Sequence, residues 1–351
     1  MASVADPMAS SRSSAREHHD KRAGAKRPPA PAASCVMTGL TRHIRLEQPV
    51  MMGPTFWQLR RGPGDPTHRQ VGDIYLRATR TPQGPALIKI IPNGIEVAAR
   101  AWGAGAEWSL DQMPRLLGAT DDPRGFQPKP EHGPLGEAWL RYGHYRVGRT
   151  DAVFEALAPA CIEQVVTGKE AFRAWRLLVR EFGEPAPGPA RDAGSAAYGM
   201  YLPPTPDAWS RVPSWRFLAA GVEQRRSRTL VRTAARAAAL ERTLTWPCDQ
   251  VDRVLRSFPG VGPWTSAEVR QRAHGDPDAW SIGDYHVGRD ITYALTGKQL
   301  DDDACLEILE PYRGHRFRVQ MLLSMVGRRG PRRGPRMALP THTPYATHGR
   351  S

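Results

Sequence analysis

The sequence predicts an α+β protein in which a small antiparallel β-sheet precedes an all-helical domain. Short strand-like runs rich in Ile, Val and Leu, broken by glycine and proline, occupy about residues 56 to 117, and helical periodicity replaces them from about 151 to 327. Asn93-Gly94 lies between two of the strand-like runs. Because both residue types tolerate positive φ, this dipeptide favours a tight β-hairpin.

Composition and periodicity divide the chain into four segments. Residues 1–50, rich in Ala, Ser, Arg and Pro, are expected to form a disordered basic tail. Residues 51–148 are expected to form the sheet domain, with the runs FWQLRR, DIYLRATR, ALIKIIPN and IEVAARAWG as strands and DQMPRLLG as a closing helix. Residues 149–327 are expected to form the helical domain, and residues 328–351 a disordered tail of Arg, Pro and Gly.

Local signals mark several boundaries inside the helical segment. Gly183, with Pro185 two residues later, is expected to end one helix, and Thr205 with Pro206 is expected to begin another as N-cap and first helical residue. The stretch 186–199 between them contains glycines, prolines and small residues, and is expected to be a flexible loop.

The charge balance is basic, with 49 Lys and Arg against 35 Asp and Glu and a formal net charge of +14. Such a surplus favours a polyanionic partner. Residues 1–30 contain six Lys or Arg and three acids, and residues 328–351 contain six Arg and no acid. Most of the surplus therefore lies in the tails, and net charge alone is weak evidence for DNA binding.

The four cysteines, Cys35, Cys161, Cys248 and Cys305, are far apart and form no CxxC pair. This spacing argues against a structural zinc ion or an iron–sulfur cluster and fits a reducing compartment without disulfides. The chain has no run of 18 apolar residues, and its N-terminus lacks the apolar region of a signal peptide. We therefore expect an intracellular protein that does not contact a membrane.

The most informative segment is SFPGVGPWT, in which an apolar helical run meets Pro259-Gly260-Val261-Gly262 and a second helix begins near residue 263. The glycines allow a sharp turn, and the free N–H groups and dipole of the second helix favour a phosphate. This pattern predicts a helix-hairpin-helix element that binds the DNA backbone without reading bases. The alternative is an ordinary helical hairpin with a tightly closed turn.

Asp284 is the second feature of interest. It follows Gly283, lies 22 residues after Gly262 and precedes the helical run VGRDITYAL. Taken alone, an aspartate before a helix is most simply an N-cap.

The combination of FPGVGPWT with GDY at this distance is similar to the signature of the helix-hairpin-helix DNA glycosylases, and most resembles their 3-methyladenine DNA glycosylase II branch. The similarity covers roughly residues 150–327, with a weaker match over about 55–145. The resemblance implies a base-excision repair enzyme with Asp284 as its catalytic carboxylate. It also implies double-stranded DNA with a damaged base as the partner, a monomer, and a cytoplasmic, nucleoid-associated location.

The reaction that the resemblance implies depends mainly on one catalytic group, a carboxylate. The damaged nucleotide is extruded from the duplex at a cost of a few kcal/mol. A carboxylate beneath its sugar then stabilises the oxocarbenium-like charge and orients water. Bifunctional relatives carry a Schiff-base lysine two residues after the second hairpin glycine, where this chain has Trp264. The resemblance therefore implies a monofunctional glycosylase that needs no cofactor and has no iron–sulfur cluster.

The resemblance also assigns a base pocket, with aromatic rings that attract a cationic base. Its members would be Trp264, Tyr285 and Tyr312, and plain core packing is the alternative for each. Glu268 stands where relatives carry a further tyrosine.

Further residues would contact DNA by resemblance. Gln164 would lie in the minor groove, and Val165 would be the apolar wedge that fills the gap left by the base. Backbone carbonyls in the hairpin would hold a monovalent cation against a phosphate. The hairpin contacts would come from Gly260, Val261, Gly262 and Thr265, the cation ligands from Arg256, Phe258 and Val261, and further phosphate contacts from Arg270, Arg272 and Arg289.

Three other functions stay open at this point. The chain could be a non-catalytic DNA-binding protein that kept the hairpin, or a glycosylase for deaminated bases such as uracil or hypoxanthine. An RNA-binding protein that uses its basic tails is the third, but it leaves the spacing between FPGVG and Asp284 unexplained.

Overall fold

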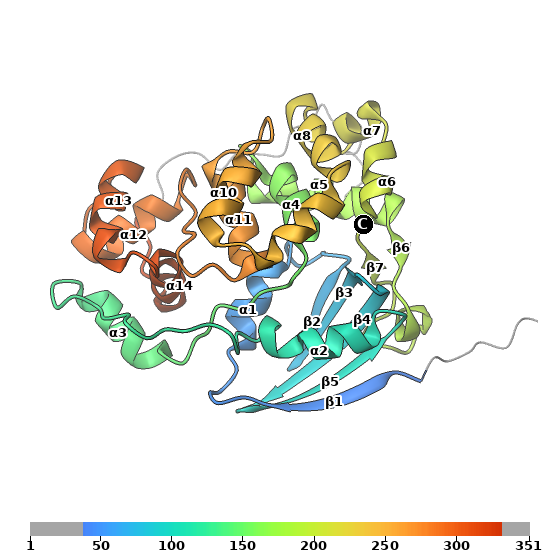
Figure 1. The fold of residues 1–351 in the computed structure, drawn as a ribbon, viewed down its shortest axis with the longest axis horizontal. Coiled ribbons are helices and arrows are strands. Elements are labelled where there is room, and N and C mark those ends of the chain that lie inside the picture. Colours follow the sequence, from blue (N-terminus) through green and yellow to red (C-terminus); the bar gives the residue numbers. More distant parts are fainter. Residues whose placement is uncertain (1–37, 332–351) are drawn as a thin grey trace, which may run out of the picture. The chain divides into compact units, whose positions relative to one another are not determined.

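The fold is taken from a computed structural model, which describes residues 38–331 (Figure 1). A five-stranded antiparallel sheet and many helices make up this part of the chain, as the sequence predicts. Within residues 38–331 no helix combines the length and the apolar character needed to cross a bilayer. Residues 332–351 of the expected tail 328–351 and residues 1–37 of the expected tail 1–50 lie outside the described residues.

The sheet has the strand order β1-β5-β4-β3-β2, and every neighbouring pair is antiparallel. Asn93 pairs with Glu96 across the turn between β4 and β5, which confirms the hairpin predicted at Asn93-Gly94. The strands are β1 (Leu40–Arg45), β2 (His68–Val71), β3 (Ile74–Thr81), β4 (Gly84–Asn93) and β5 (Glu96–Trp102).

Two sequence predictions at the start of the chain are wrong. Leu40–Arg45, expected to belong to a disordered tail, form the edge strand β1 because each residue pairs with β5 and Ile44 is buried. The run FWQLRR, expected to be a strand, belongs largely to helix α1 (Met52–Leu59). Met52 and Phe56, one helical turn apart, both enter the core, and this spacing favours a helix over a strand.

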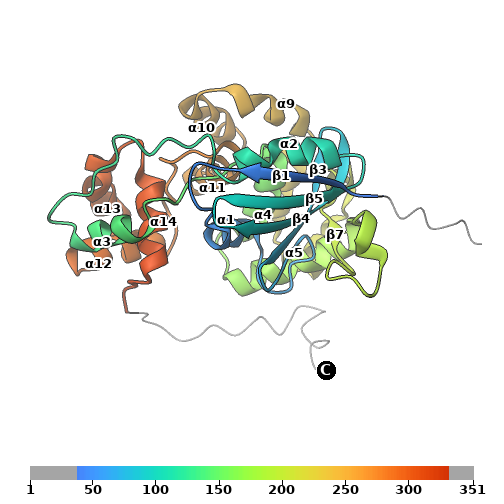
Figure 2. The ribbon, with the colours of Figure 1, turned by 90° about the horizontal axis from the view of Figure 1, so that it is seen from below.

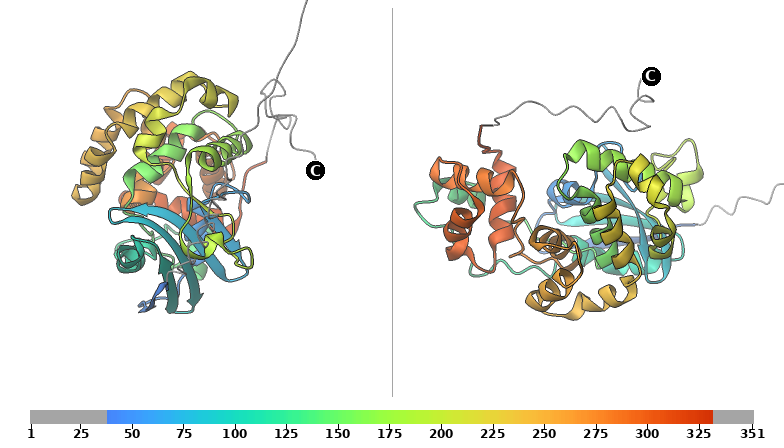
Figure 3. Two further views of the ribbon diagram at one scale, coloured as in Figure 1. Left: turned by 90° about the vertical axis from the view of Figure 1, so that its right-hand side faces the viewer. Right: turned by 90° about the horizontal axis from the view of Figure 1, so that it is seen from above.

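Each face of the sheet is covered by a different segment. Helix α2 (Ala106–Leu116) packs with α1 on one face, through residues such as Leu110 and Met113. The other face, with Leu87 and Trp102, packs against buried residues of the segment 186–202 (Figure 3). This segment contains η1 (Gly188–Arg191) and ends with β7 (Tyr201–Leu202), which pairs with β6 (Glu184–Pro185) just before the segment. The expectation of a flexible loop at 186–199 is therefore wrong, because Ala186, Ala190 and Ala197 are buried against the sheet.

A large helical core lies beside the sheet, with α4 (Val153–Glu163) packed against several other helices. The carboxylate of Glu241 accepts hydrogen bonds from the backbone of Val153 and Phe154, at 2.9 Å each, and so satisfies the first turn of α4. The other helical elements here are α5 (Gly168–Phe182), α6 (Pro206–Arg211), α7 (Ser214–Ala219), α8 (Gln224–Ala234), α9 (Ala237–Glu241), η2 (Arg242–Thr245), α10 (Cys248–Arg256), α11 (Pro263–Val269) and η3 (Arg270–His274).

The capping signals in this core are confirmed. Helix α5 ends at Phe182 with Gly183 as its C-cap. The side chain of Thr205 accepts a hydrogen bond from the backbone of Ala208, 3.0 Å away, and Pro206 is the first residue of α6.

A second helical cluster contains the last part of the described chain. Its core brings Phe126 and Leu135 together with Ile291 and Leu322. Helix α3 (Gly133–Tyr142) thus packs against α12 and α14, and the three helices lie together in Figures 1 and 2. The residues of α3 were expected to belong to the sheet domain. The elements are α3 (Gly133–Tyr142), α12 (Val287–Thr296), α13 (Asp302–Leu309), η4 (Glu310–Tyr312) and α14 (Arg316–Val326).

Buried His274 leads to a prediction about stability at low pH. Its Nε2 lies 3.1 Å from the Thr243 hydroxyl, and burial, with the nearby Arg149 and Arg270, lowers the pKa of His274 to about 4. The unfolded chain takes up this proton near pH 6.5, whereas the folded protein takes it up only near pH 4. The free energy of unfolding should therefore fall by about 3 kcal/mol as the pH falls through this window.

Chemical denaturation of the wild type and of His274→Gln at a series of pH values between these limits tests this assignment. The free energy of unfolding of His274→Gln should fall much less over this pH range. Parallel curves for the two proteins would show that other groups cause the acid sensitivity.

Candidate active site and nucleic-acid interface

The predicted hairpin is present between α10 and α11, which lie next to each other (Figure 1). The backbone N–H of Val261 donates to the carbonyl of Phe258, 2.9 Å away, and closes the turn. The Val261 side chain is buried in the large helical core. The turn is therefore anchored from inside by Val261, and the glycine at position 260 is exposed.

Several backbone N–H and C=O groups of this turn form no backbone hydrogen bond within residues 38–331. Within residues 38–331, no acceptor takes the N–H of Gly262 or of Trp264. Among the same residues, no backbone N–H donates to the carbonyls of Arg256 and Val261, whereas the Phe258 carbonyl accepts from Val261. Free donors and free carbonyls next to each other are suited to bind an anion and a cation, respectively.

The two hairpin glycines should respond differently to alanine. Gly260 has φ +94°, and a Cβ there would lie 2.0 Å from the Thr229 hydroxyl oxygen, so Gly260→Ala should lower the free energy of unfolding by about 3 kcal/mol. Gly262 has extended backbone, and a Cβ there would meet nothing within 4 Å. Gly262→Ala should leave stability within about 0.5 kcal/mol but weaken DNA binding about 10-fold, because the methyl group would occupy the approach of a phosphate.

Denaturant unfolding and fluorescence anisotropy with a labelled duplex measure the two effects. Gly262→Ala with wild-type DNA affinity would place the phosphate elsewhere. An equal loss of stability in both variants would contradict the turn geometry.

Gln164 lies directly after α4 and joins it to the hairpin. Its amide nitrogen donates to the carbonyl of Gly260 and to the hydroxyl of Thr265, both at 2.8 Å. The Gln164 side chain thus contacts the hairpin at two points, and the end of α4 is held beside the turn.

Val165, the next residue, is fully exposed at 100% and has φ +52°. A β-branched residue is strained in this left-handed region, and such strain persists only where the surrounding structure imposes it. The apolar side chain gains nothing from packing inside the protein. Exposure and strain together mark Val165 as a residue presented to an external surface.

Three residues expected to contact phosphates have internal partners instead. Thr265 is 2% exposed and its hydroxyl accepts from Gln164. Arg270 forms ion pairs with Asp252 and Asp276, and Arg272 with Glu268. These guanidinium groups are largely buried and neutralise carboxylates inside the protein, a use that spacing alone does not reveal.

The carboxylate of Asp284 has one bonded and one free oxygen. Its Oδ1 accepts from the backbone of His286 at 2.8 Å and of Val287 at 3.0 Å, at the start of α12. Its Oδ2 accepts no hydrogen bond from residues 38–331, and the side chain is half-buried and outside the hydrophobic cores. Asp284 thus stabilises a helix start with one oxygen while the other stays available.

Helix α11 faces the loop that carries Asp284. A Cβ at Gly283 would lie 3.8 Å from the Trp264 Cβ, so the indole begins beside this loop. One turn further along, Glu268 accepts from the hydroxyl of Ser281 at 2.7 Å and from Arg272 at 2.6 Å. Helix α11 therefore lies beside the loop that carries Asp284 both at Trp264 and at Glu268.

The Asp284 loop is held in place through Ser281, by contacts that the sequence did not predict. The side-chain oxygen of Gln320 accepts from the backbone of Ser281 at 2.8 Å, and its nitrogen donates to the Ser281 hydroxyl at 3.0 Å. Gln271 also donates to this hydroxyl, at 3.0 Å. No local pattern links residues from α14, η3 and the loop, so only the tertiary structure could identify the network.

The expected aromatic pocket is only partly assembled. Tyr285 is 65% exposed beside Asp284, with the guanidinium of Arg289 4.7 Å from its ring centre. Tyr312 is wrong as a pocket residue, because it is 2% exposed within the second helical cluster and its hydroxyl contacts His132 and the backbone of Lys129. Of the three expected pocket residues, Trp264 lies beside the Gly283 end of the Asp284 loop and Tyr285 directly follows Asp284 in the chain.

The sequence matches no protein-family model and no curated protein. Its fold, however, is similar to the folds of solved DNA glycosylases. A 3-methyladenine DNA-glycosylase from Archaeoglobus fulgidus superposes with a TM-score of 0.64 at 19% identity, covering 81% of this chain and 97% of that protein. An 8-oxoguanine glycosylase/lyase from Clostridium acetobutylicum in its apo-form gives 0.61 at 14% identity, covering 81% and 95%. The same enzyme in complex with double-stranded DNA gives 0.57 at 12% identity, covering 82% and 98%.

Proposed function

We propose that this chain is a monofunctional DNA glycosylase that extrudes a damaged, alkylated base from duplex DNA and hydrolyses its N-glycosidic bond. The observation that carries this proposal is the position of strained, fully exposed Val165 beside the hairpin, next to a residue that contacts the hairpin turn. A wedge must be apolar, exposed and rigidly held, because it replaces a base in the stack. The fold shared with known glycosylases supports the same function.

In this proposal the hairpin binds a phosphate through the backbone of Gly260, Val261 and Gly262. Val165 enters the gap left by the extruded nucleotide. The free Oδ2 of Asp284 faces the sugar, stabilises the positive charge that develops there and orients water. An alkylated purine is already cationic and needs no strong general acid to leave. Trp264 and Tyr285 border the base, and their electron-rich rings favour a cation.

Trp264 supports hydrolysis without strand cleavage. An indole cannot form the Schiff base by which a lyase breaks the backbone. DNA treated with the protein should therefore stay unbroken until alkali cleaves the abasic sites.

The hairpin carbonyls of Arg256, Phe258 and Val261 are suited to hold a monovalent cation that bridges to a phosphate. Two of them accept no backbone N–H within residues 38–331, and the third has a lone pair left beside its bond to Val261. We expect tighter DNA binding in potassium than in lithium at equal ionic strength. Equal affinities in the two salts would argue against a bound cation.

A base-release assay on duplexes that contain methylated purines, hypoxanthine or uracil tests the proposed function. We expect release of methylated purines to exceed that of the other bases. Fastest release of uracil or hypoxanthine would instead indicate a glycosylase for deaminated bases. Tight binding without release of any base would indicate a non-catalytic DNA-binding protein.

A further inference from the structure

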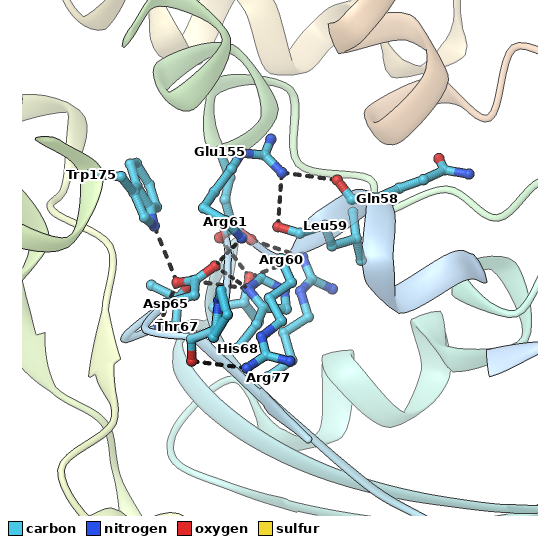
Figure 4. A network of polar contacts seen from close by, with 12 residues as sticks. Gln58, Leu59, Arg60, Arg61, Asp65, Thr67, His68, Arg77, Glu155 and Trp175 are labelled. Carbon is cyan, nitrogen blue, oxygen red and sulfur yellow. Dashed lines mark hydrogen bonds and ion pairs between the residues drawn. The ribbon is translucent and has the colours of Figure 1, made fainter. Parts of the chain in front are cut away.

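The tip that carries Gln164 and Val165 joins two helices, α4 before it and α5 after it. Both helices contact one short loop that follows α1, residues 61–67: α4 through an ion pair between Glu163 and Arg61, and α5 through a hydrogen bond between Trp175 and Asp65, which Figure 4 shows. This loop belongs to the sheet part of the chain, since it leads into β2. The sheet part therefore contacts the flanks of the tip.

The contact before the tip is a buried ion pair. Arg61 Nε lies 2.6 Å from Glu163 Oε1, and the side chains are only 5% and 15% exposed. Glu163 is the last residue of α4 and directly precedes Gln164. The Arg61 guanidinium also donates to the carbonyls of Gln58 at 2.8 Å and Leu59 at 3.0 Å, which fixes it against the end of α1.

The contact after the tip passes through Asp65, whose side chain is fully buried. Its Oδ1 accepts from the indole N–H of Trp175 in α5 at 3.1 Å and from the backbone N–H of Thr67 at 2.8 Å, and its Oδ2 accepts from the backbone of Arg61 at 2.6 Å. Burial raises the pKa of Asp65, but the nearby His68 and the backbone hydrogen bonds from Arg61 and Thr67 outweigh it and lower this pKa to about 2. Asp65 is thus a charged and fully bonded anchor at neutral pH.

A strained tip needs such support. Val165 can relax to ordinary φ values only if the chain around it shifts. Arg61 holds Glu163, two residues before Val165, and Asp65 holds α5 at Trp175, ten residues after it. A displacement of about 1 Å at a positioned group can cost about 100-fold in rate.

We propose that Arg61 and Glu163 are positioning residues for DNA extrusion: the sheet part of the chain, through this pair, holds the Gln164–Val165 tip in the conformation that enters the duplex. The inference rests on the proposed function and adds to it a role for the sheet part. It predicts that the tip loses function when the pair is removed, even though neither residue contacts DNA.

The chain offers a matched control pair. Arg77 in β3 contacts Glu155 near the start of the same helix α4, with Nη2 and Oε1 2.9 Å apart and exposures of 3% and 18%. This pair also joins the sheet to α4, but it lies two helical turns from the tip. Replacing both members of a buried pair by neutral residues avoids an uncompensated charge and is often tolerated.

The experiment compares Arg61→Met/Glu163→Gln with Arg77→Met/Glu155→Gln in the full chain. Extrusion is followed by 2-aminopurine fluorescence beside an abasic-site analogue at saturating protein, base release gives kcat and KM, and denaturation gives stability. The first double variant should lose about 10- to 100-fold in kcat and most of the fluorescence rise, with KM changed less. The control should stay within about 3-fold of the wild type in kcat at a similar or greater loss of stability.

Equal losses of extrusion in both double variants would show that the Arg61–Glu163 pair only stabilises the fold, and would overturn the inference. Full extrusion by Arg61→Met/Glu163→Gln would overturn it as well. A wild type that extrudes the nucleotide but releases no base would overturn the proposed function and leave the inference standing. A wild type without a fluorescence rise would overturn both.

Discussion

Asp284→Asn is expected to reduce base release by about 1,000-fold while DNA affinity changes less than about 3-fold. The amide is neutral and cannot stabilise the positive charge that develops on the sugar. Its oxygen can still accept from the backbone of His286 and Val287, so the start of α12 should be preserved. Single-turnover release of a methylated purine and anisotropy titration measure the two effects.

Asp284→Ala separates the structural from the chemical contribution of this side chain. Alanine removes the acceptor at the start of α12 and should lower the free energy of unfolding by about 1 kcal/mol more than asparagine does. If Asp284→Asn releases base as fast as the wild type, Asp284 serves only the helix start and another group performs the chemistry.

Val165→Gly is expected to change stability and function in opposite directions. Glycine adopts φ +52° without strain, and the fully exposed side chain gives up no internal packing, so the free energy of unfolding should rise by about 1 kcal/mol. Loss of the apolar wedge should lower kcat for base release about 10-fold, because the extruded state loses a partner worth more than 1 kcal/mol. Denaturant unfolding and base release on the same preparation provide the measurement.

Val165→Leu is the matched control, because leucine is apolar and lacks the β-branch. It should keep base release near the wild-type rate. A decrease in rate for Val165→Leu equal to that for Val165→Gly would show that the side chain is not a wedge. A destabilised Val165→Gly would show that the backbone is not strained there.

The parts of the candidate site that could be predicted from the sequence are those whose residues are neighbours in the chain. The PGVG turn has a local pattern of its own, whereas the roles of Gln164, Val165 and Asp284 came from the resemblance of the segments that contain them and stay predictions. Tyr312 was wrong because an aromatic residue in a helical region looks the same whether it borders a site or fills a core. The internal partners of Arg270 and Arg272 were not predicted, because sequence spacing does not reveal buried carboxylates.

The sequence by itself determined the local elements of this protein: the hairpin at Asn93-Gly94, the helix ends at Gly183 and Thr205, and the turn at residues 259–262. These depend on backbone conformations and capping groups within a few residues, which residue types specify directly. Only the tertiary structure decided that Leu40–Arg45 complete the sheet and that Arg61 meets Glu163. Such contacts join residues distant in sequence, and their energy depends on burial and geometry that no local pattern contains.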